Sequence, residues 1–342
     1  MKIKRKSFVW LSITLNIILI LTVIIFVLKY QIEDNFSDQI YYNETVQDSA
    51  TFFWPSTKKM ALSLTFDDAK VSQIDSGIPI LDKYNVKATF YVSPDNLGVR
   101  LEEWRNAVKK GHEIGNHSTK HPCSINFGFQ HIKSLENLSM SEMQDDLTTE
   151  NQLIRKLLGV QPVSFAYPCG ETTVGQGLNT RSYVPIVSSI FESGRLSSVG
   201  GYVNPLYSDI SQLPSAELDN KTFDQVKELI EEAKATGKWL ILSTHNVGDG
   251  NNSGYNDLIT SKSTLEAVCK YANDPSNGIW IDNVNNITCY IKEKRGEKPF
   301  NHLAEYKKPT SSLYSKVWSL YYIWKIRVTH YSYVIKKKLK IS

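Results

Sequence analysis

The stretch Met60-Ala-Leu-Ser-Leu-Thr-Phe-Asp-Asp68 decides the fold of this chain. Leu62, Leu64 and Phe66 alternate with smaller residues, and this period of two predicts a β-strand. The strand ends on two adjacent carboxylates, Asp67 and Asp68. Working residues of parallel β/α folds project from the carboxyl ends of strands. The acidic pair therefore marks the edge of a sheet at which we expect chemistry.

Strands and helices alternate along the chain beyond this stretch. Val86–Val92 is typical of a second strand, and Ile78–Tyr84 can form a helix between the two, so the unit is βαβ and the sheet is parallel. Further helices are predicted over Glu102–Lys110, Ser141–Leu158, Phe223–Thr236, Thr264–Asn273 and Val284–Lys294, and further strands over Val163–Tyr167, Trp239–Thr244 and Gly278–Asp282. The stretch 170–215 is rich in Gly, Ser and Pro and matches no regular element. Six or seven alternations without a glycine-rich phosphate loop favour a β/α barrel over a doubly wound sheet.

The N-terminus predicts attachment to a membrane. Residues 8–28 carry no charge and are long enough to cross a bilayer as a helix, and four basic residues precede them. We expect a cytoplasmic start at 1–7, a transmembrane signal anchor at 8–28 and an extracytoplasmic linker at 29–57. The body at 58–298 then lies outside the cell membrane. A cleaved signal peptide is the alternative, but the apolar run is long for one and no small-x-small site follows it.

The C-terminal tail, residues 299–342, carries nine Lys or Arg residues and one acid. One apolar stripe and its basic flanks predict an amphipathic helix here: Val317, Leu320, Tyr321, Trp324, Val328, Tyr331 and Ile335, flanked by Lys316, Lys325, Arg327 and Lys336. Such a helix can lie on an anionic membrane surface, cover the barrel or contact an anionic glycan. Because the basic residues gather at the two ends and the body is net acidic, we expect no nucleic-acid partner.

The segment His117-Ser-Thr-Lys-His121-Pro122 supplies two histidines. Pro122 disfavours helical geometry at His121, so the two histidines share a turn. Two imidazoles and one carboxylate leave coordination positions open for water, which is the arrangement of a hydrolytic metal site. Taken singly, each of these residues is better explained as an ordinary surface group.

Four ordered motifs together resemble the polysaccharide deacetylase family, also called the NodB-homology fold or carbohydrate esterase family 4. The motifs are Thr65-Phe-Asp-Asp68, His117-Ser-Thr-Lys-His-Pro122, Phe165-Ala-Tyr-Pro-Cys-Gly170 and Leu242-Ser-Thr-His245, within about residues 58–298. The resemblance implies a distorted (β/α)7 barrel in the α/β class. It also implies a division of roles: Asp68, His117 and His121 for a divalent metal, most simply Zn²⁺; Asp67 as general base; His245 as general acid; and Tyr167, Cys169 and Gly170 for the oxyanion and the substrate.

Two departures from the family pattern bear on activity. Many members have Gly after the acidic pair and Arg before the aromatic-Pro segment, where this chain has Ala69 and Ala166. The missing Arg would have paired with the base, so the tuning of Asp67 stays open. No clear motif supplies a carboxylate that orients the acid histidine, and Asp209 is the nearest candidate.

The four cysteines allow disulfides if the body is exported. In the resemblance, Cys123 and Cys169 both lie near the metal, which makes a bridge between them the favoured interpretation. Cys269 and Cys289 would form the second pair. Four unpaired thiols remain the alternative.

The function implied by the resemblance is hydrolytic removal of acetyl groups from an N-acetylated, GlcNAc-containing polysaccharide of the cell surface or cell wall. An O-acetyl glycan esterase is a variant of the same chemistry. Two further hypotheses are a carbohydrate-binding protein with low or no activity on the same fold, and a cyclic-amide hydrolase with the same metal set. The presence of both base and acid argues against a pure binder, and the predicted export argues against the cyclic amides.

Overall fold

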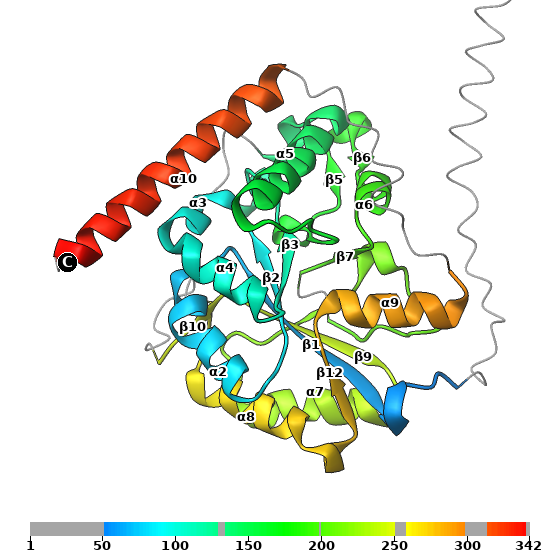
Figure 1. The fold of residues 1–342 in the computed structure, drawn as a ribbon. Coiled ribbons are helices and arrows are strands. Elements are labelled where there is room, and N and C mark those ends of the chain that lie inside the picture. Colours follow the sequence, from blue (N-terminus) through cyan, green and yellow to red (C-terminus); the bar gives the residue numbers. More distant parts are fainter. Residues whose placement is uncertain (1–50, 129–133, 198–199, 250–257, 298–312, 340–342) are drawn as a thin grey trace, which may run out of the picture. The chain divides into compact units, whose positions relative to one another are not determined.

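The computed structural model describes residues 51–128, 134–197, 200–249, 258–297 and 313–339 (Figure 1). The chain divides into two compact units, Met1–Thr51 and Phe52–Ser342. The predicted cytoplasmic start, the anchor and most of the linker lie outside the described residues. Among the helices that are described, none has both the length and the apolar character needed to cross a membrane.

Seven parallel strands form one curled row in the order β7-β4-β3-β2-β1-β9-β8. Their bounds are β1 Met60–Asp67, β2 Thr89–Val92, β3 Glu113–Asn116, β4 Ser164–Ala166, β7 Ser193–Arg195, β8 Ala216–Glu217 and β9 Trp239–Thr244, while β12, Ile279–Ile281, branches from the row beside β1. The two short pairs outside the row are β5, Thr173–Val174, with β6, Arg181–Ser182, and β10, Asn246–Val247, with β11, Ile259–Thr260. An isolated parallel bridge, Arg195 to Leu213, extends from β7 toward the segment that leads into β8. The predicted barrel is therefore a curled, half-closed barrel.

The helices follow the predicted alternation. Their bounds are α2 Ile78–Lys83, α3 Pro94–Leu97, α4 Leu101–Lys109, α5 Met140–Leu158, α6 Val184–Ile190, α7 Phe223–Ala235, α8 Lys262–Asn273, α9 Val284–Arg295 and α10 Leu313–Leu339. Helix α5 begins with a capping box between Ser139 and Glu142 and ends at Gly159, whose φ of 78° suits glycine. The stretch without a predicted element holds only short pieces, α6 and β7 among them, which explains why it shows no period.

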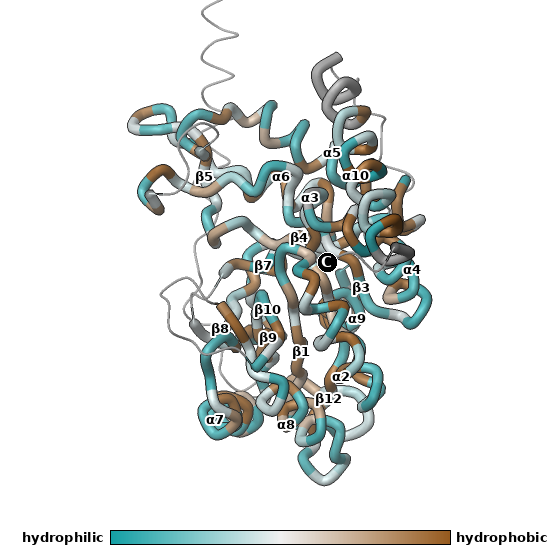
Figure 2. The backbone as a smooth tube through the Cα atoms, turned by 90° about the vertical axis from the view of Figure 1, so that its left-hand side faces the viewer, coloured by the Kyte–Doolittle hydropathy of each residue, from teal (hydrophilic) through white to brown (hydrophobic). Residues whose placement is uncertain are grey.

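The two faces of β1 have different partners. Met60, Leu62, Leu64 and Phe66 point into the main apolar core, which also contains buried residues of α2, α7 and α8. Figure 2 shows brown, apolar segments along β1 and β9 and along the helices α7 and α8. Side chains of a strand alternate between faces, so the intervening residues of β1 point to the inner side of the curl and lead to Asp67.

The inner side is polar and closely packed. Thr89 and Ser164 donate hydrogen bonds to the two carboxylate oxygens of Glu113, at 2.7 and 2.6 Å. At Gly115 an added Cβ would overlap the ring of Tyr91, so this strand position requires glycine. The polar interior continues toward the carboxyl ends of the strands and into the site described below.

The amino ends of the strands are closed by an apolar plug. Trp54 is buried, its Nε1–H donates to the carbonyl of Gly237 at 2.9 Å, and it packs in one cluster with Trp239 and residues of α9 such as Ile287. Trp54 lies within the predicted linker at 29–57 and is nevertheless packed into the body.

Candidate active site

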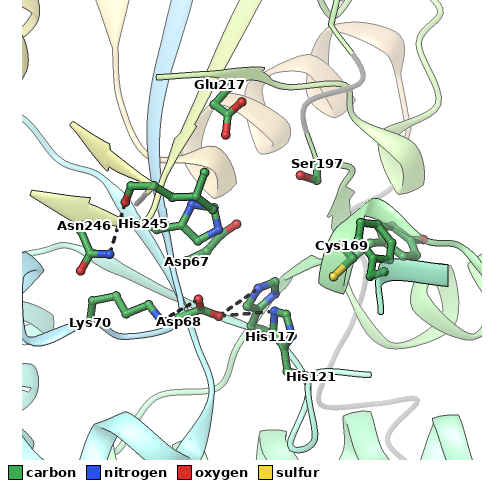
Figure 3. A pocket seen from close by; sticks show the side chains of 13 residues that line it. Asp67, Asp68, Lys70, His117, His121, Cys169, Ser197, Glu217, His245 and Asn246 are labelled. Atoms are coloured by element: carbon green, nitrogen blue, oxygen red, sulfur yellow. Dashed lines mark hydrogen bonds and ion pairs between the residues drawn. The ribbon is translucent and has the colours of Figure 1, made fainter. Parts of the chain in front are cut away.

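The carboxyl ends of the strands surround a cavity of about 400 Å³. Its lining includes Asp67 and Asp68 at the end of β1, His117 after β3, Cys169 after β4 and His245 after β9 (Figure 3). Five residues predicted from separate segments therefore lie at one opening.

Asp68, His117 and His121 form a group of potential metal ligands. Asp68 Oδ1 lies 3.6 Å from His117 Nε2 and 3.4 Å from His121 Nε2, and their ligand atoms are all within 4.8 Å of one another. His117 Nδ1–H donates to the carbonyl of Ala166 at 2.9 Å, so its Nε2 is left to face Asp68. Such a hydrogen bond fixes the tautomer of a ligand imidazole.

The loop between the two histidines is a tight turn, as Pro122 predicted. Ser118 and His121 have φ values of 62° and 47°, in the left-handed region. Ser118 Oγ accepts from the His121 N–H at 2.9 Å, and the buried Asp146 of α5 accepts from the Thr119 N–H at 3.1 Å. The conformation of the turn is therefore fixed by hydrogen bonds at Thr119 and at His121.

Electrostatics favours the ligand form of the aspartate and of the buried histidine. Burial by itself raises the pKa of Asp68, but His117, His121 and Lys70 outweigh it and hold the pKa below its usual value. Burial lowers the pKa of His117 to about 4 against the attraction of the neighbouring aspartates. A carboxylate and two imidazoles at this spacing fit a divalent metal ion. When bound, such an ion supplies Lewis acidity that activates water and polarises a carbonyl group.

Asp67 is paired with Arg195, a residue that no sequence motif indicated. Arg195 Nη2 donates to both carboxylate oxygens, with 2.6 Å to Oδ1, and the side chains of Arg195 and Asp67 are 1% and 5% exposed. The guanidinium also lies over the ring of Tyr91, 5.1 Å from its centre. Burial by itself raises the pKa of Asp67, but Arg195 and the nearby histidines outweigh it and lower the pKa.

The Arg195–Asp67 pair shows that Ala166 does not leave Asp67 without a cation. In the register of β4 and β7, Ala166 lies directly beside Arg195. Side chains at paired positions of parallel strands point to the same face. The cation that the family pattern puts on one strand is therefore supplied here by the neighbouring strand, and Asp67 does not lack a partner.

His245 is oriented by Asp219 and not by Asp209. His245 Nδ1–H donates to Asp219 Oδ2 at 2.8 Å, and Thr244 Oγ1 donates to the other oxygen at 2.6 Å. Burial opposes the charged form of His245, but Asp219, Asp67 and Asp68 outweigh it and raise the pKa. Asp209 instead accepts from the Ser211 N–H at 2.8 Å on a separate surface turn, so that prediction was wrong.

One buried amide ties the ends of β1 and β9 together. Gln73 Nε2 donates to the carbonyl oxygens of Asp67, at 2.6 Å, and of His245, at 2.8 Å. Gln73 is fully buried. The ends of β1 and β9 are thereby held side by side.

The turn after β4 differs in part from its predicted role. Cys169 has a φ of 55° and lines the cavity, but the Gly170 N–H donates to the carbonyl of Tyr167 at 2.9 Å and does not point to the site. The Tyr167 hydroxyl donates to the carbonyl of Ser211 at 2.9 Å, and its ring is buried. Of the three predicted residues, Cys169 is the best placed to meet a substrate.

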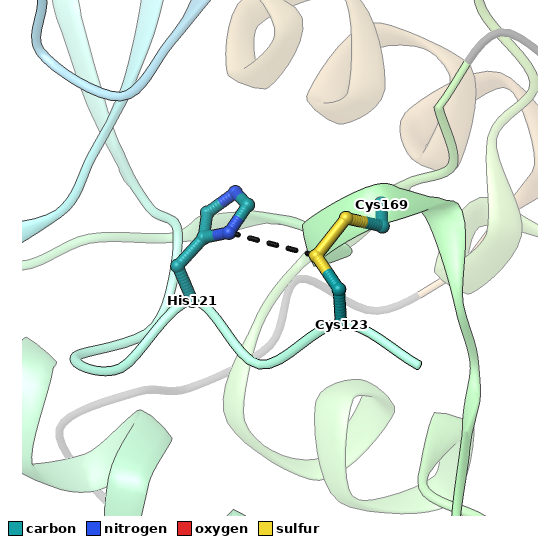
Figure 4. Close-up of side chains that lie close together, drawn as sticks. All are labelled: His121, Cys123 and Cys169. Carbon is teal, nitrogen blue, oxygen red and sulfur yellow. Dashed lines mark hydrogen bonds between the residues drawn. A yellow bond between two sulfur atoms is a disulfide. The ribbon is translucent and has the colours of Figure 1, made fainter. Parts of the chain in front are cut away.

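A disulfide joins this turn to the histidine loop. Cys123 and Cys169 are bonded across 46 residues of sequence, and the Cys123 sulfur lies 3.7 Å from His121 Nδ1 (Figure 4). The predicted second bridge is wrong: Cys269 is a buried free thiol on α8, and Cys289 is an exposed one on α9. The two remaining cysteines thus lie on different helices in different environments.

A curled parallel sheet that brings three potential metal ligands, a further carboxylate and a histidine to one cavity has the groups that a hydrolytic metal site requires. Residues 55–180 match the family model described as polysaccharide deacetylase, which assigns this part of the chain to the polysaccharide deacetylase family. The matched region contains Asp67, Asp68, His117 and His121 and ends before Arg195.

Curated relatives match a similar share of the chain. A peptidoglycan-N-acetylglucosamine deacetylase of Bacillus cereus is 31% identical over 125 residues, 34% of this chain and 39% of that protein. The peptidoglycan-N-acetylglucosamine deacetylase PgdA of Listeria monocytogenes is 36% identical over 110 residues, 32% of this chain and 21% of that protein. The chain thus spans less than half the length of these relatives.

A solved structure supports the fold over a longer range. A crystal structure from Mycobacterium smegmatis, described as a candidate polysaccharide deacetylase, superimposes with a TM-score of 0.50 at 14% identity. It covers 73% of this chain and 96% of that one. The shared fold therefore extends well beyond the region that matches in sequence.

Proposed function

We propose that this chain is a metal-dependent deacetylase that releases acetate from an N-acetylated, GlcNAc-containing polysaccharide. The observation that carries the proposal is the convergence of Asp68, His117 and His121 at one cavity that Asp67 and His245 also line. The names of the relatives in Bacillus cereus and Listeria monocytogenes support peptidoglycan as the first substrate to test. Zinc is the metal that the carboxylate and imidazole donors favour.

Asp67 and His245 each carry out one of the two proton transfers. Asp67, whose pKa Arg195 helps to lower, accepts a proton from the attacking water, and His245, whose pKa Asp219 helps to raise, donates one to the departing amine. Water adds to the acetamide carbonyl, the C–N bond breaks, and the products are acetate and a free amino sugar. Both pKa shifts favour the protonation state that the step requires.

The expected location is outside the cell membrane, with residues 8–28 as the anchor. This expectation comes from the uncharged run and the basic residues before it. Protease accessibility of the body in intact cells tests it. A body digested only after lysis would contradict it.

Acetate release from peptidoglycan, chitin oligomers and poly-GlcNAc tests the function. We expect release that a chelator abolishes and added Zn²⁺ restores, and that Asp67→Asn and His121→Ala each lower by at least about 100-fold. Asp209→Asn is the matched control, because this carboxylate lies outside the site, and it should keep full activity. Persistent release in Asp67→Asn would refute the mechanism.

An esterase and a carbohydrate-binding protein would give different results in the same assay. Acetate released only from O-acetylated glycans would identify an esterase. Glycan binding without any acetate release, in protein loaded with metal, would identify a carbohydrate-binding protein. The second outcome is disfavoured by Asp67 and His245, because binding alone has no use for a base and an acid.

A further inference from the structure

Helix α10 packs on the body through one narrow face. Tyr322, Ile323 and Ile326 are buried, and α10 contacts α3, α5 and the short turn Gly98–Arg100. At Gly98 an added Cβ would lie 2.7 Å from the carbonyl oxygen of Ile326, so glycine permits this close approach. The helix is therefore fixed in rotation about its own axis.

The opposite face of α10 exposes large apolar side chains along most of its length. They are Leu320, Tyr321, Trp324, Val328, Tyr331 and Ile335, each between 45% and 66% exposed. A helix advances about 100° per residue, so all six fall within a stripe about 100° wide. This is the stripe that the sequence predicted, and its position away from the body is what the structure adds. Contiguous apolar surface of this kind marks an interaction site.

Positive charge borders the stripe and no negative charge accompanies it. The segment Leu313–Leu339 contains six Lys or Arg residues and no acidic one. On the helical projection Arg327 lies along one side of the stripe, and Lys325 and Lys336 along the other. An apolar stripe with Trp and Tyr and with cations on both sides is the pattern of a helix that lies in a membrane interface.

We propose that this exposed stripe of α10 docks on the surface of an anionic lipid bilayer. The apolar side chains enter the interface, and the flanking cations meet lipid phosphates. A second copy of the chain is a poorer occupant, because a two-fold pairing of the stripe would bring rows of like charge together. A hydrophilic glycan is also poorer, since it would leave the aliphatic side chains uncovered. The proposal does not depend on the catalytic activity.

Docking has a consequence for the body, because α10 is packed against it. Arg100 lies over the ring of Tyr333, 5.4 Å from its centre, and adds to the contacts at Gly98. A helix held at both places transmits its own orientation on the bilayer to the sheet. The cavity would then be presented at a defined angle to the membrane.

The full chain in proteoliposomes provides the test, with Trp324 as the probe. The difference in fluorescence between wild type and Trp324→Phe isolates the signal of this residue. We expect lipids with brominated acyl chains to quench it in vesicles that contain phosphatidylglycerol. Each cation near an anionic surface raises the membrane-binding constant roughly fivefold. Combined Lys325→Gln, Arg327→Gln and Lys336→Gln should therefore weaken docking on the order of 100-fold and abolish the quenching.

Controls separate the stripe from general effects. Three exposed lysines elsewhere, changed together as Lys109→Gln, Lys227→Gln and Lys270→Gln, remove the same charge and should leave the quenching unchanged. Leu320→Glu with Val328→Glu should abolish docking while the unfolding temperature changes little, because these side chains are 65% and 48% exposed.

Three outcomes would overturn the proposal. The first is an unquenched Trp324 in protein that stays with the vesicles, and the second is equal quenching in vesicles of phosphatidylcholine alone. The third is a dimer, found by sedimentation in detergent, that Leu320→Glu dissociates, which would make a second copy the occupant. Each result would exclude an anionic bilayer as the partner of α10.

Discussion

Replacing Arg195 with methionine should damage both stability and catalysis. Methionine keeps much of the side-chain length and removes the charge, so Asp67 becomes a buried carboxylate without its cation. Loss of one partner of a buried ion pair costs about 3–5 kcal/mol. For a domain of this size that corresponds to a fall in unfolding temperature of roughly 10 °C.

The catalytic effect has a direction set by the pKa of Asp67. Arg195 is the main group that opposes burial, so without it burial raises the pKa of Asp67. The base must be ionised, and the acid limb of the kcat/KM profile should therefore move to higher pH in Arg195→Met. General-base catalysis contributes about 10²–10⁴-fold, which bounds the loss at neutral pH.

Moving the arginine provides the control. Ala166 and Arg195 are neighbours in register, so Ala166→Arg with Arg195→Ala puts the cation at the position that is usual in the family. We expect the double variant to recover activity relative to Arg195→Ala. The assay is acetate release against pH, together with thermal unfolding. An unchanged acid limb and an unchanged kcat in Arg195→Met would refute the reasoning.

Three further predictions concern other contacts of the site. Asp219→Asn removes a group that raises the pKa of His245, so the alkaline limb of the kcat/KM profile should move to lower pH; an unmoved limb would contradict this. Cys123→Ser with Cys169→Ser opens a 46-residue link, which should cost about 2–4 kcal/mol in denaturant unfolding and lower metal affinity by roughly tenfold in a chelator titration. Gly115→Ala places a methyl group against an aromatic ring and should lower the free energy of unfolding by about 1–3 kcal/mol, and full stability would show that the ring can move.

The fold was predictable where the local signals are strong. The alternation in β1 and the apolar run of β9 place both strands to within a residue, since each is buried on both faces. Helix α5 was equally clear because its amphipathic period and Gly159 agree. Near residues 170–215 the regular elements are too short to establish a period.

The site was predictable where its residues form short motifs. Asp67, Asp68 and the two histidines are close in sequence or follow recognisable strands. Arg195 was missed because its partner is 128 residues away, and its one signal is a lone cation in a Ser- and Gly-rich stretch. Whether two distant residues such as Arg195 and Asp67 pair depends on the order of the strands, which the whole sheet determines.

The predicted Cys123–Cys169 bridge is confirmed, whereas the second cysteine pair and the acid-orienting assignment were wrong. An even number of cysteines suggested two bridges, yet Cys269 is buried on α8 and Cys289 is exposed on α9. Asp209 was chosen as the nearest candidate for a missing family motif, whereas Asp219 follows β8, the direct neighbour of β9. Adjacency in the sheet decides such contacts.

The amide of Gln73 has a consequence for the working range of the protein. It is a neutral group that spans the backbone carbonyls beneath Asp67 and His245. An ion pair in this position would weaken with added salt or with a change of protonation, but an amide does neither. The spacing of the two proton-transfer groups should therefore persist across changes of salinity and acidity, while only their charges vary.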